Sequence, residues 1–149
     1  MKLAKLLKLH PETSASDWHQ HSNGGGWVQN TATVAASAYV GGNALICDNA
    51  KVLDNAMVYG NAEVSGNALV CNYARISGYA WVFENAWIYG GAKVSGTTRV
   101  SGHARVCEHA WISGFARVCE NAEIFGDAKV SGNAWVSGDA RVSGQDILV

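Results

Sequence analysis

The chain has 149 residues, enough for one domain or one short array of repeats. It contains 17 glycines but a single proline, which excludes a proline-rich disordered chain, and the glycines show no collagen triplet. With 11 lysines and arginines against 12 acids, the net charge of -1 gives no overall attraction to nucleic acid or to an anionic membrane.

Residues 1–27 form an N-terminal segment without internal repetition. Leucines and lysines intermingle from Lys2 to Leu9, which predicts a short amphipathic piece that either caps the following array or docks another subunit. No apolar run in the chain approaches the roughly 20 residues that span a bilayer. The basic start also lacks the long apolar stretch of a signal peptide, so we expect a cytoplasmic protein without membrane contact.

Residues 28–149 repeat every six residues. Stepping by six from Val28 to Leu148 visits 21 positions, which hold 15 Val, 5 Ile and 1 Leu, and the residue two before each is alanine in 18 cases. A helix has a period of 3.6 and a simple strand a period of 2, so neither fits. A branched aliphatic followed by Gly or Asn, repeated every six residues, predicts a short strand and a tight turn.

Three such repeats close a triangular coil of 18 residues, and parallel coils stack about 4.8 Å apart. The gapless repeat, typified by Val58-Tyr59-Gly60-Asn61-Ala62-Glu63, resembles the hexapeptide-repeat superfamily over residues 26–149. The resemblance implies an all-β fold, a single-stranded left-handed parallel β-helix. This would be a three-sided solenoid of about 6–7 coils with a short N-terminal capping segment. The left hand comes from the resemblance alone, because general crossover rules favour a right hand.

The stretch that leads into the array carries a second resemblance. Asn23-Gly24-Gly25-Gly26-Trp27-Val28 is similar to the start of small hexapeptide-repeat proteins of bacteria and their phages. Many of these proteins are labelled transferases by similarity alone, so the label says little about activity.

The repeated aliphatics are predicted to point inward, and the residues on either side of each to point outward. Residues 18 apart then form columns along three faces. The first face carries Trp27, Leu45, Glu63, Trp81, Arg99, Arg117 and Trp135. The second face carries Thr33, Lys51, Leu69, Trp87, Arg105, Glu123 and Arg141. The third face carries Tyr39, Met57, Arg75, Lys93, Trp111 and Lys129.

Charged residues in these columns follow two patterns. On the second face Arg105, Glu123 and Arg141 alternate in sign, whereas on the first face Arg99 and Arg117 are neighbouring like charges between tryptophans. Stacking on the indoles would relieve the repulsion by about 0.5–1 kcal/mol for each arginine. From the sequence we interpret both columns as elements that only stabilise the prism.

The third face is predicted to be flat and locally positive. Its corner is glycine in successive coils, and its strands carry no carboxylate before Asp146. We define the basic face as Arg75, Ser77, Lys93, Ser95, Trp111, Ser113 and Lys129. Such a surface suits an acidic or polar partner, or close packing of another subunit. The alternative interpretation is a solvated face produced by drift of the repeat.

Six aromatic residues fall within about one coil, all at outward or corner positions. We define the aromatic band as Tyr73, Tyr79, Trp81, Phe83, Trp87 and Tyr89. Large exposed apolar patches usually mark interfaces, so we expect a homo-oligomer, dimer or trimer, or a protein partner at this band. The alternative is that each ring packs along neighbouring strands of its own face.

Candidate chemical groups are sparse and widely spaced. The cysteines all follow an inward aliphatic and are expected to face outward as free thiols: Cys47, Cys71, Cys107 and Cys119. Their spacing supports neither a disulfide nor a zinc site, so we predict no metal and no cofactor. Asp48, Glu84 and Glu120 recur every 36 residues, two coils apart, which is too far for a catalytic carboxylate pair.

Two histidines, His103 and His109, take the place where most repeats have asparagine. Acyltransferases of the superfamily that the chain resembles use a histidine near a subunit interface as general base. The resemblance therefore implies an alternative function, an acyl-CoA-dependent acyltransferase that binds acetyl-CoA between subunits and uses His103 or His109 as the base. Such enzymes usually carry loops that break the repeat, but no loop interrupts residues 28–148.

The leading functional prediction is a non-catalytic β-helical scaffold or binding protein. It would present a rigid surface for self-assembly or for a protein partner. The resemblance to phage proteins adds the hypothesis of a phage-derived version that blocks a host protein.

Overall fold

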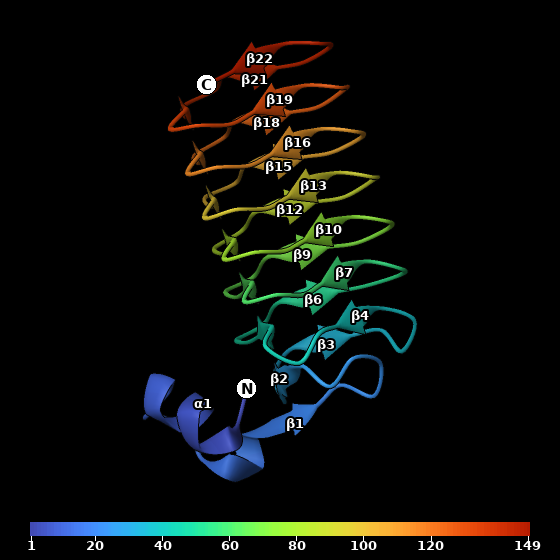
Figure 1. Cartoon of the computed structure of the whole chain (residues 1–149), viewed down its shortest axis with the longest axis vertical. Coiled ribbons are helices and arrows are strands. Elements are labelled where there is room, and N and C mark those ends of the chain that lie inside the picture. The colour runs from blue at the N-terminus through green and yellow to red at the C-terminus, as the bar shows by residue number, and fades with distance from the viewer.

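The computed structural model describes residues 1–149 and is a three-sided parallel β-solenoid with a short helix at its N-terminal end (Figure 1). Each face holds seven parallel strands, so the prism has about seven coils. Each strand pairs with the strand 18 residues further on, as Arg75 does with Lys93. These findings confirm the predicted solenoid of 18-residue coils, whereas its left hand stays a prediction.

The strands of each face follow one another along the prism. The first face contains β2 (Trp27–Gln29), β5 (Leu45–Ile46), β8 (Glu63–Val64), β11 (Trp81–Val82), β14 (Arg99–Val100), β17 (Arg117–Val118) and β20 (Trp135–Val136). The second contains β3 (Thr33–Val34), β6 (Lys51–Val52), β9 (Leu69–Val70), β12 (Trp87–Ile88), β15 (Arg105–Val106), β18 (Glu123–Ile124) and β21 (Arg141–Val142). The third contains β4 (Tyr39–Val40), β7 (Met57–Val58), β10 (Arg75–Ile76), β13 (Lys93–Val94), β16 (Trp111–Ile112), β19 (Lys129–Val130) and β22 (Ile147–Leu148).

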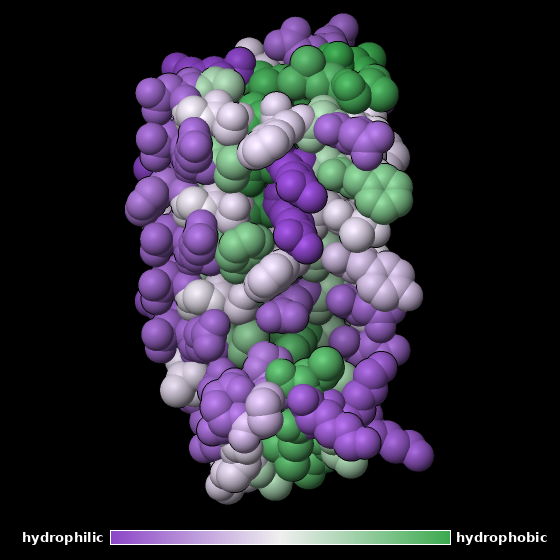
Figure 2. Space-filling model, turned by 90° about the vertical axis from the view of Figure 1, so that its left-hand side faces the viewer, coloured by the Kyte–Doolittle hydropathy of each residue, from purple (hydrophilic) through white to green (hydrophobic).

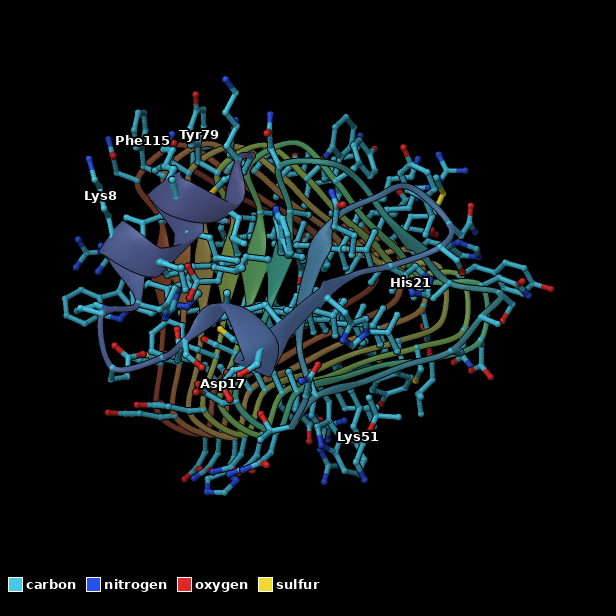
Figure 3. All side chains as sticks on the ribbon, turned by 90° about the horizontal axis from the view of Figure 1, so that it is seen from below. Lys8, Asp17, His21, Lys51, Tyr79 and Phe115 are labelled. Carbon is cyan, nitrogen blue, oxygen red and sulfur yellow. The ribbon has the colours of Figure 1, made fainter.

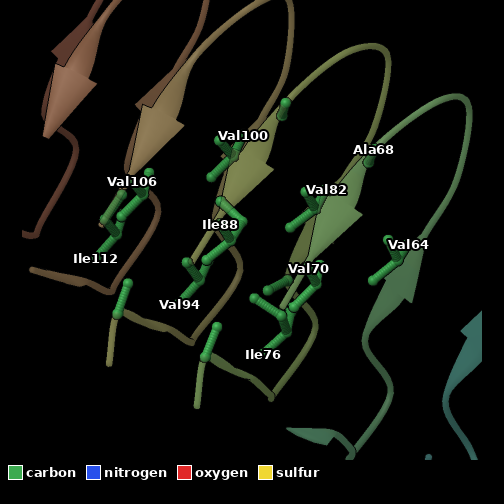
Figure 4. Close-up of a cluster of buried hydrophobic side chains, with 14 of the residues drawn as sticks. Val64, Ala68, Val70, Ile76, Val82, Ile88, Val94, Val100, Val106 and Ile112 are labelled. Atoms are coloured by element: carbon green, nitrogen blue, oxygen red, sulfur yellow. The ribbon is translucent and has the colours of Figure 1, made fainter. Parts of the chain in front are cut away.

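The core is a column of aliphatic side chains and alanines inside the prism. A single cluster of 34 buried residues runs along it, and Figure 4 shows labelled valines and isoleucines of successive coils directed into the same interior. Of the 21 predicted inward aliphatics, Val34 is half-buried and Leu148 is 38% exposed, while the others are buried. The predicted inward direction of the repeat is therefore confirmed, and the core is thinnest at its two ends.

The corners explain where the acids lie. Six residues other than glycine adopt a left-handed backbone: Asp48, Asp54, Asn72, Glu84, Glu108 and Glu120. The side chain of each accepts a hydrogen bond from the backbone N–H 18 residues on, as Glu84 does from Gly102 at 2.6 Å. At the third corner a Cβ on Gly96, whose φ is +71°, would lie 2.6 Å from the carbonyl oxygen of Gly114. Glycine is therefore needed there.

The N-terminal segment lies on the first coils of the same chain. It contains α1 (Leu3–Leu9), a 3-10 turn (Ala15–Asp17) and β1 (Trp18–Gln20). Strand β1 pairs antiparallel with β2 and covers the strand edge of the first face. Helix α1 packs on the same face, where Leu6 is buried against Leu45 and Cys47. None of the helices combines the length and the apolar character that crossing a membrane requires.

This packing buries one cysteine. Cys47 points away from the coil, as predicted, but it is 2% exposed because α1 covers it. All four cysteines are free. The predicted outward direction of Cys47 is therefore confirmed, but its burial was not predicted, because the sequence does not show on which face the helix packs.

Candidate binding surfaces

The first face beyond α1 presents two arginines between two tryptophans. Arg99 and Arg117 lie directly opposite each other on β14 and β17. The Arg99 guanidinium lies 5.6 Å from the ring centre of Trp81, which stacks on Phe83 at 4.2 Å. The Trp81 indole also donates a hydrogen bond to Ser65 Oγ at 3.0 Å, so its orientation is fixed. Figure 2 looks onto this side, with strongly hydrophilic side chains in mid-view and paler ones above and below.

A shallow hollow of about 330 Å³ adjoins the second arginine. It is lined by Phe115, Arg117, Asn133 and Trp135. Phe115 and Trp135 are 64% and 68% exposed, so most of their ring surface is open to solvent. Figure 3 shows Tyr79 and Phe115 projecting outward from the same edge of the prism. The arginine pair is thus bordered by exposed rings.

Neither arginine has an acidic partner. The single ion pair of the array joins Arg141 Nε to Glu123 Oε2 at 3.2 Å on the second face. The acids at the corner that follows the first-face strands, Glu84 and Glu120, accept hydrogen bonds from the amides of Gly102 and Gly138. The corner amides therefore engage the carboxylates, and the first-face arginines remain without a counter-charge.

The second face shows the opposite arrangement. Arg105 lies 5.2 Å from the ring centre of Trp87, and Arg141 lies 5.0 Å from that of Phe125. Glu123 stands between the two arginines in strand register. This column alternates in sign and is covered by its own rings.

The third face contains the predicted basic face and a shallow hollow within it. The hollow measures about 200 Å³. Its lining consists of Tyr59, Arg75, Ser77, Lys93, Ser95 and Trp111. The structure therefore brings five residues of the basic face together, while Ser113 and Lys129 lie outside the lining. Lys93 and Lys129 each place their ammonium 6.0 Å from the ring centre of Trp111.

The aromatic band is spread around the prism. Trp81 and Phe83 stack on the first face, and Trp87 lies on the second face beneath Arg105. Tyr73 and Tyr79 are 69% and 68% exposed, at two different corners. The Tyr89 phenol interacts with the Cys107 thiol, which raises the pKa of Tyr89 to about 12. A single flat partner could therefore cover only part of the band.

The two candidate histidines are exposed and stand at different corners. His103 lines a shallow hollow of about 260 Å³ with Asn85, Trp87 and Arg105. No hydrogen bond orients either imidazole, although a general base needs an orienting partner. No three His, Cys, Asp or Glu side chains form a group that could hold a metal ion.

Burial under α1 perturbs two groups on the first face. Desolvation raises the pKa of the Glu63 carboxyl above its ordinary value, while nearby His10 lowers it. Burial, with Glu63 close by, also strongly raises the pKa of the Cys47 thiol. The thiol lies 3.7 Å from Glu63 Oε1 and stays protonated and unreactive.

Reasoning from the outward columns missed two lining residues, Phe115 and Asn133, and left Tyr59 out of the basic face although it shares the column of Ser77 and Ser95. Tyr59 follows an inward aliphatic and was recognisable as outward, but its contact with the basic face depends on side-chain direction. Phe115 occupies the same corner column as Tyr79, 36 residues later. Comparing the corner columns as well as the strand columns would have found it.

Compared with known proteins, the chain matches no protein-family model, no curated protein and no solved structure. The fold and the surfaces described above are therefore the basis for assigning a function.

Proposed function

We propose that the chain is a non-catalytic binding scaffold whose first face receives an acidic segment of a protein partner. The observation that carries this proposal is the Arg99–Arg117 pair, which has no carboxylate within ion-pair distance. Like charges directly opposite each other on neighbouring strands destabilise a sheet. The second face avoids that cost by placing Glu123 between its arginines. The Trp81 indole offsets part of this cost for Arg99, but Arg117 stacks on no ring, and a column that keeps the remaining cost is better explained by binding than by stability.

The surroundings of the pair have the composition of a binding hot spot. Tryptophan, tyrosine and arginine dominate the energetics of protein interfaces. Here Trp81 and Trp135 lie on either side of the arginines, and Phe115 and Tyr79 project at the edge. The coils below them are rigid, so little conformational entropy would be lost on binding. An acidic segment with one or two apolar side chains would satisfy both the charge and the exposed rings.

Charge favours a different protein over a second copy at this face. A two-fold symmetric dimer places the same patch of both subunits in contact. Arg99 and Arg117 of one copy would then meet the same arginines of the other, and opposed like charges disfavour association. The predicted homo-oligomer, dimer or trimer, would therefore use another surface, such as the exposed parts of the aromatic band.

We also propose that the chain is a hexapeptide-repeat protein. This assignment is supported by the gapless repeat and the 18-residue strand register. The resemblance to phage proteins supports a role in blocking a host protein, which a rigid, preformed surface would suit. We place the protein in the cytoplasm because its four thiols are free.

The test selects peptides from a random display library on the intact chain and measures their affinity by fluorescence anisotropy. We expect selected peptides to contain Asp or Glu beside an apolar residue. Arg117→Ser should weaken them by about ten-fold, the loss of a hydrogen bond to a charged group. Arg105→Ser on the second face is the matched control and should leave the affinity unchanged.

Other outcomes would overturn this assignment. Selected peptides without acidic residues, or binding that ignores Arg117→Ser, would exclude the arginine pair as the recognition element. If the chain is a dimer in solution and Trp135→Ser dissociates it, the first face serves self-association instead. Clear thermal stabilisation by acetyl-CoA, lost in His103→Ala or His109→Ala, would favour the acyltransferase.

A further inference from the structure

The hollow on the third face collects hydrogen-bond donors and positive charge. Arg75 and Lys93 lie opposite each other on β10 and β13, and the next strand places Trp111 beside Lys93. Ser77 and Ser95, which directly follow these two strands, also line the hollow, together with Tyr59. From this arrangement we infer a second binding site, independent of the first face, for a dianionic tetrahedral group of the phosphate-monoester class.

The charge of the hollow calls for a dianion. Arg75 and Lys93 are both exposed and neither makes an ion pair. The outward columns of this face carry no carboxylate that could neutralise them. A phosphate monoester has a charge of about -1.5 to -2 at pH 7 and would balance the two cations. A carboxylate would leave one of the two positive charges uncompensated.

The donors also fit a tetrahedral group. The Arg75 guanidinium offers a planar fork that can hold two oxygens, and Lys93 offers a compact point charge. The Trp111 indole donates a hydrogen bond to Ser95 Oγ at 3.3 Å. Because Ser95 Oγ accepts this bond, its own hydroxyl hydrogen remains available to donate to a ligand. Ser77 supplies a further hydroxyl, so the cations and hydroxyls line the same hollow.

The size of the hollow admits more than the anion itself. Its volume of about 200 Å³ is several times the share of one water molecule in the liquid, roughly 30 Å³. A phosphate group and the first atoms of its ester would fit. The ammonium groups of Lys93 and Lys129 each lie 6.0 Å from the ring centre of Trp111. The indole therefore acts as a fixed wall, and the ester group extends toward Tyr59 or solvent.

The test is an NMR titration of the full chain, labelled with nitrogen-15, at constant ionic strength. The probes are inorganic phosphate, inorganic sulfate and acetate, with chloride as the background anion. We expect saturable shifts of the Ser77 and Ser95 amides and of the Trp111 indole N–H. Phosphate and sulfate, both tetrahedral, should bind about ten-fold more tightly than acetate, which is about 1.4 kcal/mol. Phosphate should bind more weakly as pH falls, because protonation removes one of its two negative charges, whereas sulfate stays a dianion and its affinity should not change.

Variants distinguish a specific binding site from a general attraction of anions to positive side chains. Arg75→Ser should weaken phosphate binding about ten-fold. Arg75→Lys keeps the charge but not the planar fork, so its affinity for phosphate should lie between those of Arg75→Ser and the original chain. Lys51→Ser on the second face is the control and should change nothing, and a dispersed spectrum verifies that each variant is folded. The inference is wrong if shifts do not saturate, if acetate matches phosphate, or if Arg75→Ser has no effect. Arg117→Ser should leave this titration unchanged, so the two proposed sites can fail separately.

Discussion

The first and second faces each contain seven parallel strands in the same 18-residue register, and they share one core. The two faces nevertheless arrange their charged residues differently. On the second face Glu123 separates Arg105 from Arg141 and pairs with the latter at 3.2 Å. On the first face Arg99 and Arg117 face each other without a carboxylate. The comparison teaches that the fold itself constrains the inward residues and the corners. Its outward columns can be arranged for stability or for binding.

The largest effect is expected from a substitution in the core that both faces share. Val82 is fully buried on β11, and Val82→Asp would place an unpaired charge in the core. We expect a loss of more than about 4 kcal/mol, enough to unfold the chain. Circular dichroism and size-exclusion chromatography measure this. A folded Val82→Asp variant with native thermal stability would contradict the inward direction of the repeat.

An exchange of charges tests the comparison itself. Arg117→Glu makes the first-face column alternate in sign, and we expect it to stabilise the fold by about 0.5–1 kcal/mol, or about 1–4 °C in melting temperature. Glu123→Arg breaks the ion pair on the second face and aligns three arginines, so it should destabilise by a similar amount. Thermal melts at low and high salt measure both, and salt should shrink both effects. Equal melting temperatures for all three proteins at low salt would show that the columns do not contribute to stability.

The smallest expected effect concerns the covered end of the first face. Because burial raises the pKa of Glu63, the folded state retains a proton that the unfolded state releases, and stability falls as pH rises above the ordinary value of 4.5. Glu63→Gln removes this titration. At pH 7 the variant should melt at a higher temperature than the original chain, and near pH 4 the two should coincide. Melts across this pH range measure the difference, and a lower melting temperature for the variant at pH 7 would contradict it.

The fold could be predicted because one local rule repeats without interruption. A branched aliphatic every sixth residue sets the side that each residue faces, and the coil length of 18 follows from three repeats. The positions of Arg99, Arg117 and the basic face on their columns followed from the same rule. The alternation in the column of Arg105 and Glu123 was also visible in the sequence.

What could not be predicted depends on contacts between non-repetitive parts. Nothing in residues 1–27 shows that α1 packs on the first face, so the burial of Cys47 and Glu63 was unforeseen. The hollows depend on side-chain directions, as with Tyr59 and Phe115. The bonds from corner acids to amides in the next coil explain why Glu84 does not neutralise Arg99, and they need backbone geometry that a pattern does not reveal.

The gapless register has a consequence for how such a chain can change in length. Inserting one residue that no loop at a corner absorbs would turn every later aliphatic toward solvent, since each position has a fixed direction. Removing or duplicating 18 residues keeps every column in place and shifts the remaining prism by one step of about 4.8 Å. The residues of the two proposed sites alternate along the chain between Tyr59 and Trp135, so whole coils can be gained or lost without splitting either site only before Tyr59 or after Trp135.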